Sequence, residues 1–561
     1  MVEFGKETPV ASFIRTAITM PRGSNAALSY LLSSNAVPKT CETASVQIQI
    51  DNLASQIAQL RPKLEELEDQ LRLHRAVLSP VRRVPAEIWG EVFKLVLPKK
   101  RNDTEDREKL VDLQLVCKTW RDAARLEHRL WSGVKIYCPD ETFSVEKIEE
   151  WLDRSGNVPR SLKICLSGHD DCEEQYSECR MHNPALAALL VKGGPLYELS
   201  LSYEDTQCFR VLLDSLKTVD APPTNHPWDS LKSLTCTFGG RWTESPDPSK
   251  SIFTSLPSNV TSFKLHLPYK ILAFPEEFDS AATPLNIPQR FLEQLTSFSL
   301  VSDWEGLKWL ECTLPFCTNV EELSFDFNFD RWTCDRSENG VQQRFRSGFL
   351  LPKVRTLSLQ KVYSSSLDIL SFLKTPQLVD LEIKSNGPQD MNDCEFAELV
   401  LEFIERSNCK ASMRRLSLCW VQLDAEQLAD TLRDLPFLTH LTLDGIVLPL
   451  ENKDGNTFDI LSTDFPPSLP QLEVLELLNL DFRFSDTWLL EFLESRRPFT
   501  MKNGAPSFQD PPDTLKKLTV TFRTPSQDGR QIDTTETIRV LKKWCGVSVH
   551  VGPKASVISN Y

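Results

Sequence analysis

Four residues of the sequence have side chains and a spacing that could bind a metal ion. His169, Cys172, Cys179 and His182 stand in the order His-x2-Cys-x6-Cys-x2-His, within the acidic segment GHDDCEEQYSECRMH. Two thiolates and two imidazoles can hold zinc tetrahedrally. Zinc sites usually pair like ligands and place a longer span between the pairs, so the segment fits an exposed loop between repeats better. We therefore expect no metal and no cofactor.

Motifs for catalysis do not occur elsewhere in the chain. The sequence contains no glycine-rich phosphate loop, no Gly-x-Ser-x-Gly elbow and no His-Glu-x-x-His helix. The 15 cysteines are spread over 561 residues without a dense framework, which is typical of reduced, buried thiols. The sequence thus predicts a protein that is not an enzyme.

Composition and charge exclude several classes of protein. A net charge of −15 argues against a nucleic-acid partner, because phosphate binding needs a basic face. No apolar run approaches the roughly 18 residues that span a bilayer, and the first twenty residues lack the apolar core of a signal peptide. We expect no membrane association and an intracellular location, cytoplasmic or nuclear. Residues 79–135 carry 13 Lys and Arg against 9 Asp and Glu, which favours an acidic partner there.

A short apolar pattern recurs from Trp131 onward and predicts the elements of the larger part of the chain. Each copy has an apolar residue, two others, an apolar residue, one other and a third apolar residue. Thirteen copies run from Trp131/Val134/Ile136 to Leu515/Leu518/Val520, one of them degenerate. The last two apolar residues of a copy lie on one face of a strand, and amphipathic segments such as 395–407 and 425–435 predict helices between the strands.

The spacing of the copies is irregular. Their middle residues are 24 residues apart at Leu357 and Leu381 but 43 apart at Leu475 and Leu518, whereas regular leucine-rich repeats span 20 to 29 residues. We therefore predict an α/β fold in which an irregular leucine-rich-repeat solenoid follows a helical N-terminal part. A more compact α/β domain is the alternative.

Heptad spacing precedes these repeats. Apolar residues from Ile50 to Leu78 are separated alternately by three and four residues, as in the seam of a coiled coil. Pro62 is expected to break or kink this helix near Leu60. The seam could join two copies of the chain, but four interrupted heptads are marginal, so we expect a helix packed on its own chain and a monomer outside any complex.

Two helical segments follow the heptads. Pro85 and Glu87 favour a helix start, and the segment to Leu97 has more apolar surface than a single core needs. Gly90 lowers its helix propensity, so packing must hold it. The segment 111–131 predicts an amphipathic helix or helix pair, and the charged stretch KKRNDTEDREK between the two predicts a solvated loop.

These segments carry a resemblance to a known family. Val84-Pro85-Ala86-Glu87-Ile88 with Val92-Phe93 resembles the Leu-Pro-x-Glu-Ile…Ile-Phe opening of an F-box, and Val116-Cys117-Lys118-x-Trp120 followed by Leu130-Trp131 resembles its second half. With HRAVLSPVRRVPAEIWGEVF, LLSSNAVP and WLDRSGNVP, the sequence is similar to a large F-box family of mushroom-forming fungi. The resemblance is strong over residues 28–165 and loose beyond. Val84 and Trp89 stand where the family usually has Leu.

The family resemblance implies a function. An F-box binds the Skp-type adaptor of a cullin ubiquitin ligase, and the domain behind it holds a protein substrate. The matching positions imply that Pro85, Ile88, Val92 and Phe93 face the adaptor or support that face, and that Val116 and Trp120 complete the adaptor-binding site. Trp131 is expected instead to pack the bundle against the first repeat. The alternative is a non-catalytic repeat scaffold whose F-box-like helices only cap the solenoid.

Strand alternation suggests where a substrate would bind. In a leucine-rich solenoid, the residues between and just after the inward apolar positions of each strand face the concave surface. The charged members of that set are Asp326, Glu382, Lys384 and Asp444. Three of these four are acidic, which favours a substrate segment of basic character. Binding through inserted segments such as 330–348 or 451–467 is the alternative.

The predicted organisation follows from these patterns. Residues 1–45 form a mostly disordered leader, because they are rich in Ser, Ala, Thr and Asn with scattered prolines. Residues 46–78 form the heptad helix and residues 79–133 the F-box-like bundle. Residues 134–550 form the solenoid and residues 551–561 a tail.

Overall fold

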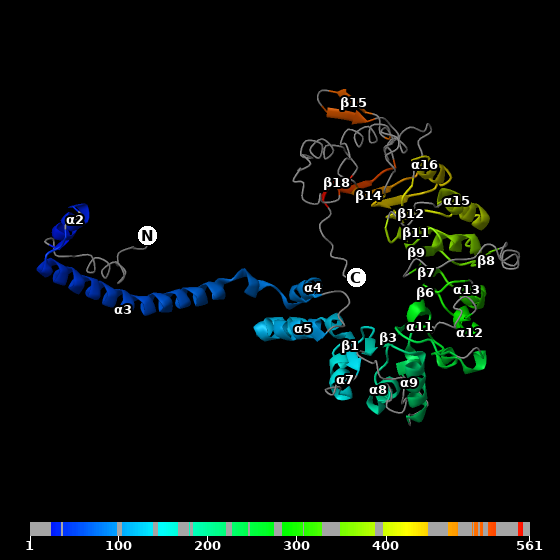
Figure 1. Cartoon of the computed structure of the whole chain (residues 1–561), viewed down its shortest axis with the longest axis horizontal. Helices are drawn as coiled ribbons and strands as arrows, with labels where there is room; N and C mark the ends of the chain where they lie inside the picture. Colours follow the sequence, from blue (N-terminus) through cyan, green and yellow to red (C-terminus); the bar gives the residue numbers. More distant parts are fainter. Residues whose placement is uncertain are drawn as a thin grey trace, which may run out of the picture. The chain divides into compact units, whose positions relative to one another are not determined.

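The structure is a computed structural model of the chain (Figure 1). It describes residues 24–34, 37–97, 104–138, 144–166, 179, 183–219, 227–244, 247–273, 283–306, 308–327, 348–387, 396–423, 425–446, 469–480, 496, 499–502, 505–508, 514–522 and 548–553. The chain divides into two compact units, residues 1–89 and 90–561, and each is described by itself.

The first unit is helical. It contains α2 (Ser24–Ser34), α3 (Thr40–Leu78) and the 3₁₀ turn η1 (Pro80–Arg83). Two predictions need correction. Part of the expected disordered leader is helical, because the Ala- and Leu-containing stretch of α2 has good helix propensity and because the Lys39 N–H donates to Glu42 Oε2 (2.8 Å) at the start of α3. Helix α3 therefore begins before residue 46.

Pro62 does not interrupt α3, contrary to the prediction. The helix runs through Pro62 for 39 residues, and none of its residues is buried. A proline inside a helix lacks one N–H donor and crowds the preceding turn, but long runs of Glu, Leu, Gln and Ala on both sides favour the helix.

The second unit begins within α4 (Ala86–Val96), which is followed by α5 (Thr104–Val116), α6 (Lys118–Leu126) and η2 (His128–Trp131). The segment 104–109, expected to be a solvated loop, belongs to α5. Its acidic residues lie in the first turns of the helix, where the helix dipole favours negative charge.

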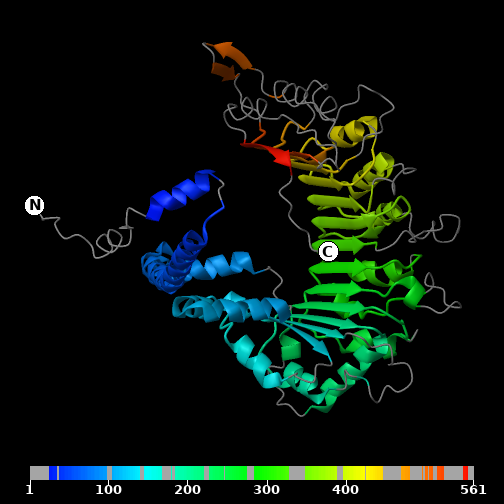
Figure 2. The same cartoon turned by 60° about the vertical axis from the view of Figure 1, so that its left-hand side comes forward.

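A parallel sheet of 14 strands forms the body of the second unit (Figure 2). The strands are hydrogen-bonded in chain order, and every neighbouring pair is parallel. They are β1 (Gly133–Cys138), β2 (Ser161–Leu166), β3 (Glu198–Tyr203), β4 (Ser233–Phe238), β5 (Ser262–His266), β6 (Ser297–Val301), β7 (Glu322–Asp326), β9 (Thr356–Val362), β11 (Asp380–Ser385), β12 (Arg415–Cys419), β13 (His440–Asp444), β14 (Val474–Leu480), β17 (Lys517–Phe522) and β18 (Ser548–Pro553).

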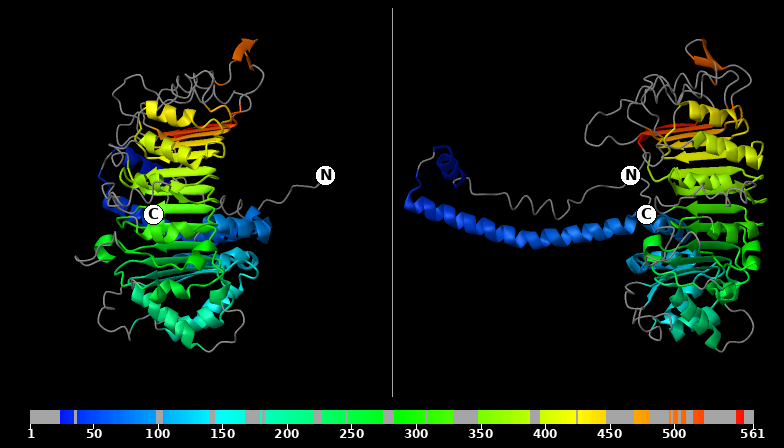
Figure 3. Two further views of the ribbon diagram at one scale, coloured as in Figure 1. Left: turned by 90° about the vertical axis from the view of Figure 1, so that its right-hand side faces the viewer. Right: turned by 45° about the vertical axis from the view of Figure 1, so that its right-hand side comes forward.

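Short strands and helices complete this unit. Two small sheets pair β8 (Phe349–Leu350) with β10 (Leu373–Lys374) and β15 (Phe499–Lys502) with β16 (Ala505–Phe508). The helices between the strands of the large sheet are α7 (Val145–Asp153), α8 (Pro184–Lys192), α9 (Thr206–Thr218), α10 (Pro227–Ser230), η4 (Pro248–Lys250), η5 (Ile252–Ser255), α11 (Lys270–Ala273), α12 (Gln289–Glu293), α13 (Lys308–Thr313), η7 (Leu314–Phe316), η8 (Ser366–Phe372), α15 (Phe396–Ser407) and α16 (Ala425–Arg433). They form an outer layer beside the stacked strands (Figure 3).

The core lies between the sheet and this outer layer. The last two apolar residues of every predicted copy are buried on the strands, and they stand in register, as in the series Leu381, Leu416, Leu441 and Leu475. Apolar residues of the helices cover them, for example Val400 and Phe403 of α15. The alternating residues of each strand point to the other side of the sheet, which we call the open face. The α/β prediction is confirmed.

The boundaries of the sheet differ slightly from the prediction. The sheet begins at Gly133, and its last strand reaches Pro553, so the first three residues of the expected tail are strand. Strand β18 was not predicted, because Gly546 stands where the pattern has its first apolar residue. No helix within the described ranges is both long and apolar enough to cross a membrane.

Candidate functional site

The bundle α4–α6 is held together by close packing around Phe93 and Gly90. The ring of Phe93 is 1% exposed and meets the Trp120 ring edge-on, with centroids 5.3 Å apart. Gly90 is also buried. A Cβ at this position would lie 3.2 Å from Glu127 Cβ, so the glycine permits the approach of α4 to the end of α6. This close packing explains why a residue of low helix propensity occupies the helix.

An ion pair reinforces the same contact. Lys94 Nζ lies 3.2 Å from Glu127 Oε2, and both side chains are largely covered. Lys94 also donates to Glu91 Oε1, one turn earlier on α4. The hydrogen bond to Glu91 and the pairing with Glu127 raise the pKa of Lys94, so this lysine is charged at any physiological pH.

Apolar side chains remain exposed on the outside of the bundle. In the second unit they are Leu95, Val96, Val111, Leu115, Val116 and Leu126, each at least 45% exposed. Scattered exposed leucines are normal, but six on three short helices are an excess for a surface that contacts only water. The described residues therefore leave an apolar surface on the bundle uncovered.

The residues predicted to contact the adaptor differ in their exposure. Val116 at the end of α5 is exposed, and Val92 and Trp120 are partly buried. Phe93 is enclosed by the bundle, which is compatible with the second of the two roles expected for it, that of supporting the predicted surface from within. In the first unit, Pro85 is exposed and Ile88 is 52% exposed.

Trp131 has the packing role that was expected for it. It is fully buried, its Nε1 donates to Ala124 O (2.7 Å), and its ring lies 4.6 Å from the ring of Trp151 on α7. The tryptophan thus connects the end of the bundle to α7, the first helix between strands of the large sheet.

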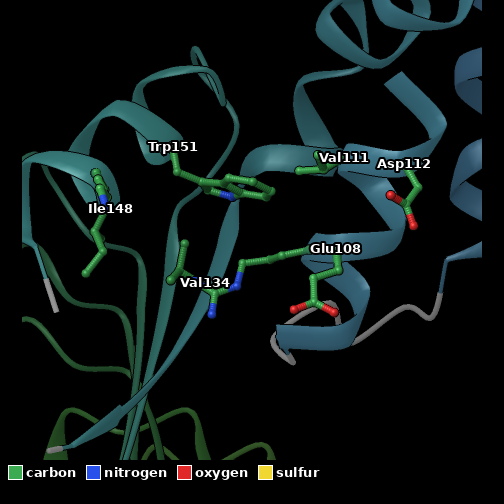
Figure 4. A pocket seen from close by; sticks show the side chains of 8 residues that line it. Glu108, Val111, Asp112, Val134, Ile148 and Trp151 are labelled. Atoms are coloured by element: carbon green, nitrogen blue, oxygen red, sulfur yellow. The ribbon is translucent and has the colours of Figure 1, made fainter. Parts of the chain in front are cut away.

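A hollow of about 390 Å³ lies beside this connection (Figure 4). Helix α5 contributes Arg107, Glu108, Val111 and Asp112, strand β1 contributes Val134, and α7 contributes Lys147, Ile148 and Trp151. The lining carries two positive and two negative side chains, and the buried Trp151 N–H has no hydrogen-bond partner among the described residues. The sequence patterns did not predict this hollow. Its lining has no Ser, Thr, Cys or His side chain, and we assign no reaction to it.

A second hollow, of about 360 Å³, lies on the open face of the sheet. It crosses β9, β11, β12 and β13, and its charged or titratable side chains are Asp380, Glu382, Arg415 and His440. Burial raises the pKa of Asp380, and the nearby Arg415 opposes this rise. Burial and Arg415 lower the pKa of His440, so its imidazole is neutral at pH 7.

The structure brings one of the four predicted substrate residues into this hollow. Glu382 accepts hydrogen bonds from Ser358 Oγ (2.7 Å) and Gln360 Nε2 (2.9 Å), and these neutral donors orient the carboxylate without cancelling its charge. Asp326, Lys384 and Asp444 lie outside its lining. On each strand they stand two residues after the middle position. Asp326 faces Lys361 Nζ at 3.4 Å, and Asp444 accepts a hydrogen bond from Asn479.

The sequence argument missed the other three charged or titratable members of the hollow. Asp380, Arg415 and His440 stand one position before the first inward apolar residue of their strands, and they are paired in register across the sheet. On each strand they lie two residues before the middle position, on the same face, so continuing the alternation toward the N-terminus would have found them.

The other end of the open face is basic. Lys163 and Lys264 occupy the middle positions of β2 and β5, with His266 following on β5. Burial, together with the positive charges of Lys264, Lys163 and Lys361, lowers the pKa of His266 to about 4. The middle position carries Glu382 in β11 and Glu476 in β14. The open face is therefore positive toward β1–β5 and negative toward β11–β14.

Thiol and metal chemistry find no support in the described residues. No group of three or more His, Cys, Asp or Glu side chains there could hold a metal ion. Of the four residues of the His169–His182 segment, only Cys179 is described, and it is buried. Burial raises the pKa of Cys317 to about 12 and that of Cys409 to about 11, so these thiols are protonated and serve packing.

Comparison with known proteins gives no family for this chain. No protein-family model matches the sequence, and no curated protein matches it. What can be stated is the class: an α/β protein with a long parallel sheet, one polar open face and a small helical bundle before the first strand.

Proposed function

We propose that the protein is the substrate-recognition subunit of a Skp/cullin/F-box-type ubiquitin ligase. The bundle α4–α6 would bind the Skp-type adaptor, and the strands and helices that follow would form an irregular leucine-rich-repeat solenoid that holds the substrate. The observation that carries the proposal is the exposed apolar surface of α4–α6, to which the F-box-like residues Ile88 and Val116 contribute. A bundle of this size buries too little apolar area to be stable without neighbours.

Substitution of exposed residues tests the adaptor contact without disturbing the core. Ile88→Asp with Val116→Asp places two charges on the proposed surface, where each would be desolvated and unpaired in a complex. Co-purification with a recombinant Skp-type adaptor should fall at least tenfold. Ile271→Asp, at a more exposed apolar residue of α11, is the control and should bind normally.

A repeat scaffold without an adaptor is the second candidate. The burial of Trp131 favours it, because its contact with Trp151 ties the bundle to the rest of its unit, as a capping element would. The two candidates differ in what they require of the exposed apolar residues and in whether the protein binds the adaptor. A cap has no need of Leu95, Leu115 or Val116 as exposed apolar residues, and a scaffold would not bind the adaptor.

The charges of the open face suggest the class of substrate. Lys264 on β5 and Glu382 on β11 are four strand spacings apart, which is about 19 Å at the usual spacing of strands. An extended peptide covers this distance with about six residues. The proposed substrate segment is therefore extended, with acidic residues toward β2–β5 and basic residues about six positions away, toward β11–β13.

A further inference from the structure

Helix α3 exposes a continuous apolar seam. Its 39 residues extend over roughly 58 Å at 1.5 Å per residue. Each apolar seam residue from Ile50 to Leu71 is between 44% and 60% exposed, and no residue of the helix is buried. A long helix with a one-sided apolar seam and polar flanks needs a second helix to cover that seam.

The residue types along the seam indicate what covers it. With Ile50 as position a of a heptad, position a carries Ile50 and Ile57 before Pro62 and Leu64 and Leu71 after it, and position d carries Leu53, Leu60 and Leu67. In the two heptads before Pro62, β-branched residues at a with leucine at d favour two parallel strands over three or four. Because both helices then present the same seam in the same direction, the fitting partner is a second copy of this chain.

Pro62 is compatible with such a pairing. It occupies position f, on the side of the helix opposite the seam, and α3 continues through it. The expectation of a monomer depended on a break at this proline, and the continuous helix removes that reason. The proline ring would face solvent in the paired helices.

Charge complementarity supports the same arrangement. Lys63 occupies position g and Glu68 occupies position e of the next heptad. In a parallel pair, position g of one helix faces position e of the following heptad in the other, so Lys63 meets Glu68 of the second copy, twice in the dimer. Gln56 and Gln70 face Arg61 and Arg75 in the same way, and no like charges meet at these positions.

We propose that α3 forms a parallel, two-stranded coiled coil with α3 of a second copy, so that the protein is a homodimer. The dimer holds two copies of the second unit on one stalk. A target that carries two binding segments would then meet both open faces, and the second binding event would be intramolecular. This proposal is independent of the proposed adaptor contact.

The mass of the full-length protein in solution tests the proposal. Light scattering during size-exclusion chromatography at micromolar concentrations should give twice the chain mass of 63.9 kDa. Leu64→Asp with Leu71→Asp should return it to the monomer mass. The matched control is Ser55→Asp with Ala76→Asp, two exposed f positions of the same helix, which should stay dimeric.

Disulfide trapping tests the orientation. Leu53→Cys places two thiols opposite each other at a d layer of a parallel, in-register pair and should give a dimer on a non-reducing gel. Ser55→Cys faces outward and should give much less. A monomer mass up to tens of micromolar, a trimer, a dimer that survives the two seam aspartates, or equal trapping of both cysteines would each overturn the proposal.

Discussion

At the scale of single residues, the open face keeps the His266 side chain neutral by lowering its pKa. Its pKa of about 4 lies below the value of about 6.5 expected in the unfolded chain. Between pH 6.5 and 4 the unfolded chain binds the extra proton and the folded chain does not, so the free energy of unfolding decreases as the pH falls through this range.

Substitution of this histidine should reduce the acid sensitivity. In His266→Gln, the loss of unfolding free energy between pH 7 and pH 4 should be smaller than in the wild type, by about 3 kcal/mol at most. Urea denaturation at a series of pH values measures the difference. Parallel curves for both proteins would show that His266 is not the group responsible.

Phe93 is the residue on which the bundle depends most. Phe93→Ala would leave a cavity against Trp120 and should lower the free energy of unfolding of the bundle by about 3 to 5 kcal/mol. Leu95→Ala, two residues away on the exposed side of α4, should change it by less than about 0.5 kcal/mol. Tryptophan fluorescence during denaturation follows both variants, and equal effects would contradict the packing described here.

Sequence reasoning identified the apolar residues of the bundle but not their directions. The helices α4–α6 carry apolar side chains on more than one side, so spacing alone cannot tell an inner residue such as Phe93 from an outer one such as Val116. The assignment depends on which helix packs on which, and that contact is made possible by Gly90. On the strands, the inward leucines were predicted correctly, whereas the hollow around Asp380 on the open face depends on side chains from four strands.

At the scale of elements, Pro62 limits the stability of α3. Replacing it by alanine restores one intrahelical hydrogen bond and relieves the crowding of the preceding turn, a gain of up to about 3 kcal/mol. Pro62→Ala should therefore raise the melting temperature of the helix, as followed by circular dichroism at 222 nm. Ser55→Ala, at another exposed position of α3, should have a much smaller effect. An unchanged transition would mean that the helix around Pro62 is not formed in solution.

The strands were more predictable than the helices. Each buried strand repeats one spacing, and neighbouring strands align their apolar residues, so sequence copies and strands coincide from β1 to β17. Strand β18 lacks the first apolar residue of the pattern. The first turns of α5 are entirely polar, and a charged stretch alone does not distinguish the start of a helix from a loop.

At the scale of the whole molecule, the division of charge along the open face should determine which substrates bind. Glu382→Gln keeps the size of the side chain and removes its charge, so it should reduce recovery of substrates with basic segments. Lys264→Gln should do the same for acidic segments. Recovery is measured by affinity purification while the downstream ligase is blocked. Glu402→Gln on the outer surface of α15 is the control. Unchanged recovery in both variants would place recognition outside the open face.

The central claim is that the apolar surface of α4–α6 binds a Skp-type adaptor, and binding calorimetry on the purified full-length protein tests it most directly. We predict saturable binding of one adaptor per chain, with a negative heat-capacity change because apolar surface leaves water. The Ile88→Asp with Val116→Asp variant should lose this binding while keeping its circular dichroism spectrum. Absence of binding at tens of micromolar adaptor, or equal binding by the wild type and the folded variant, would contradict the account.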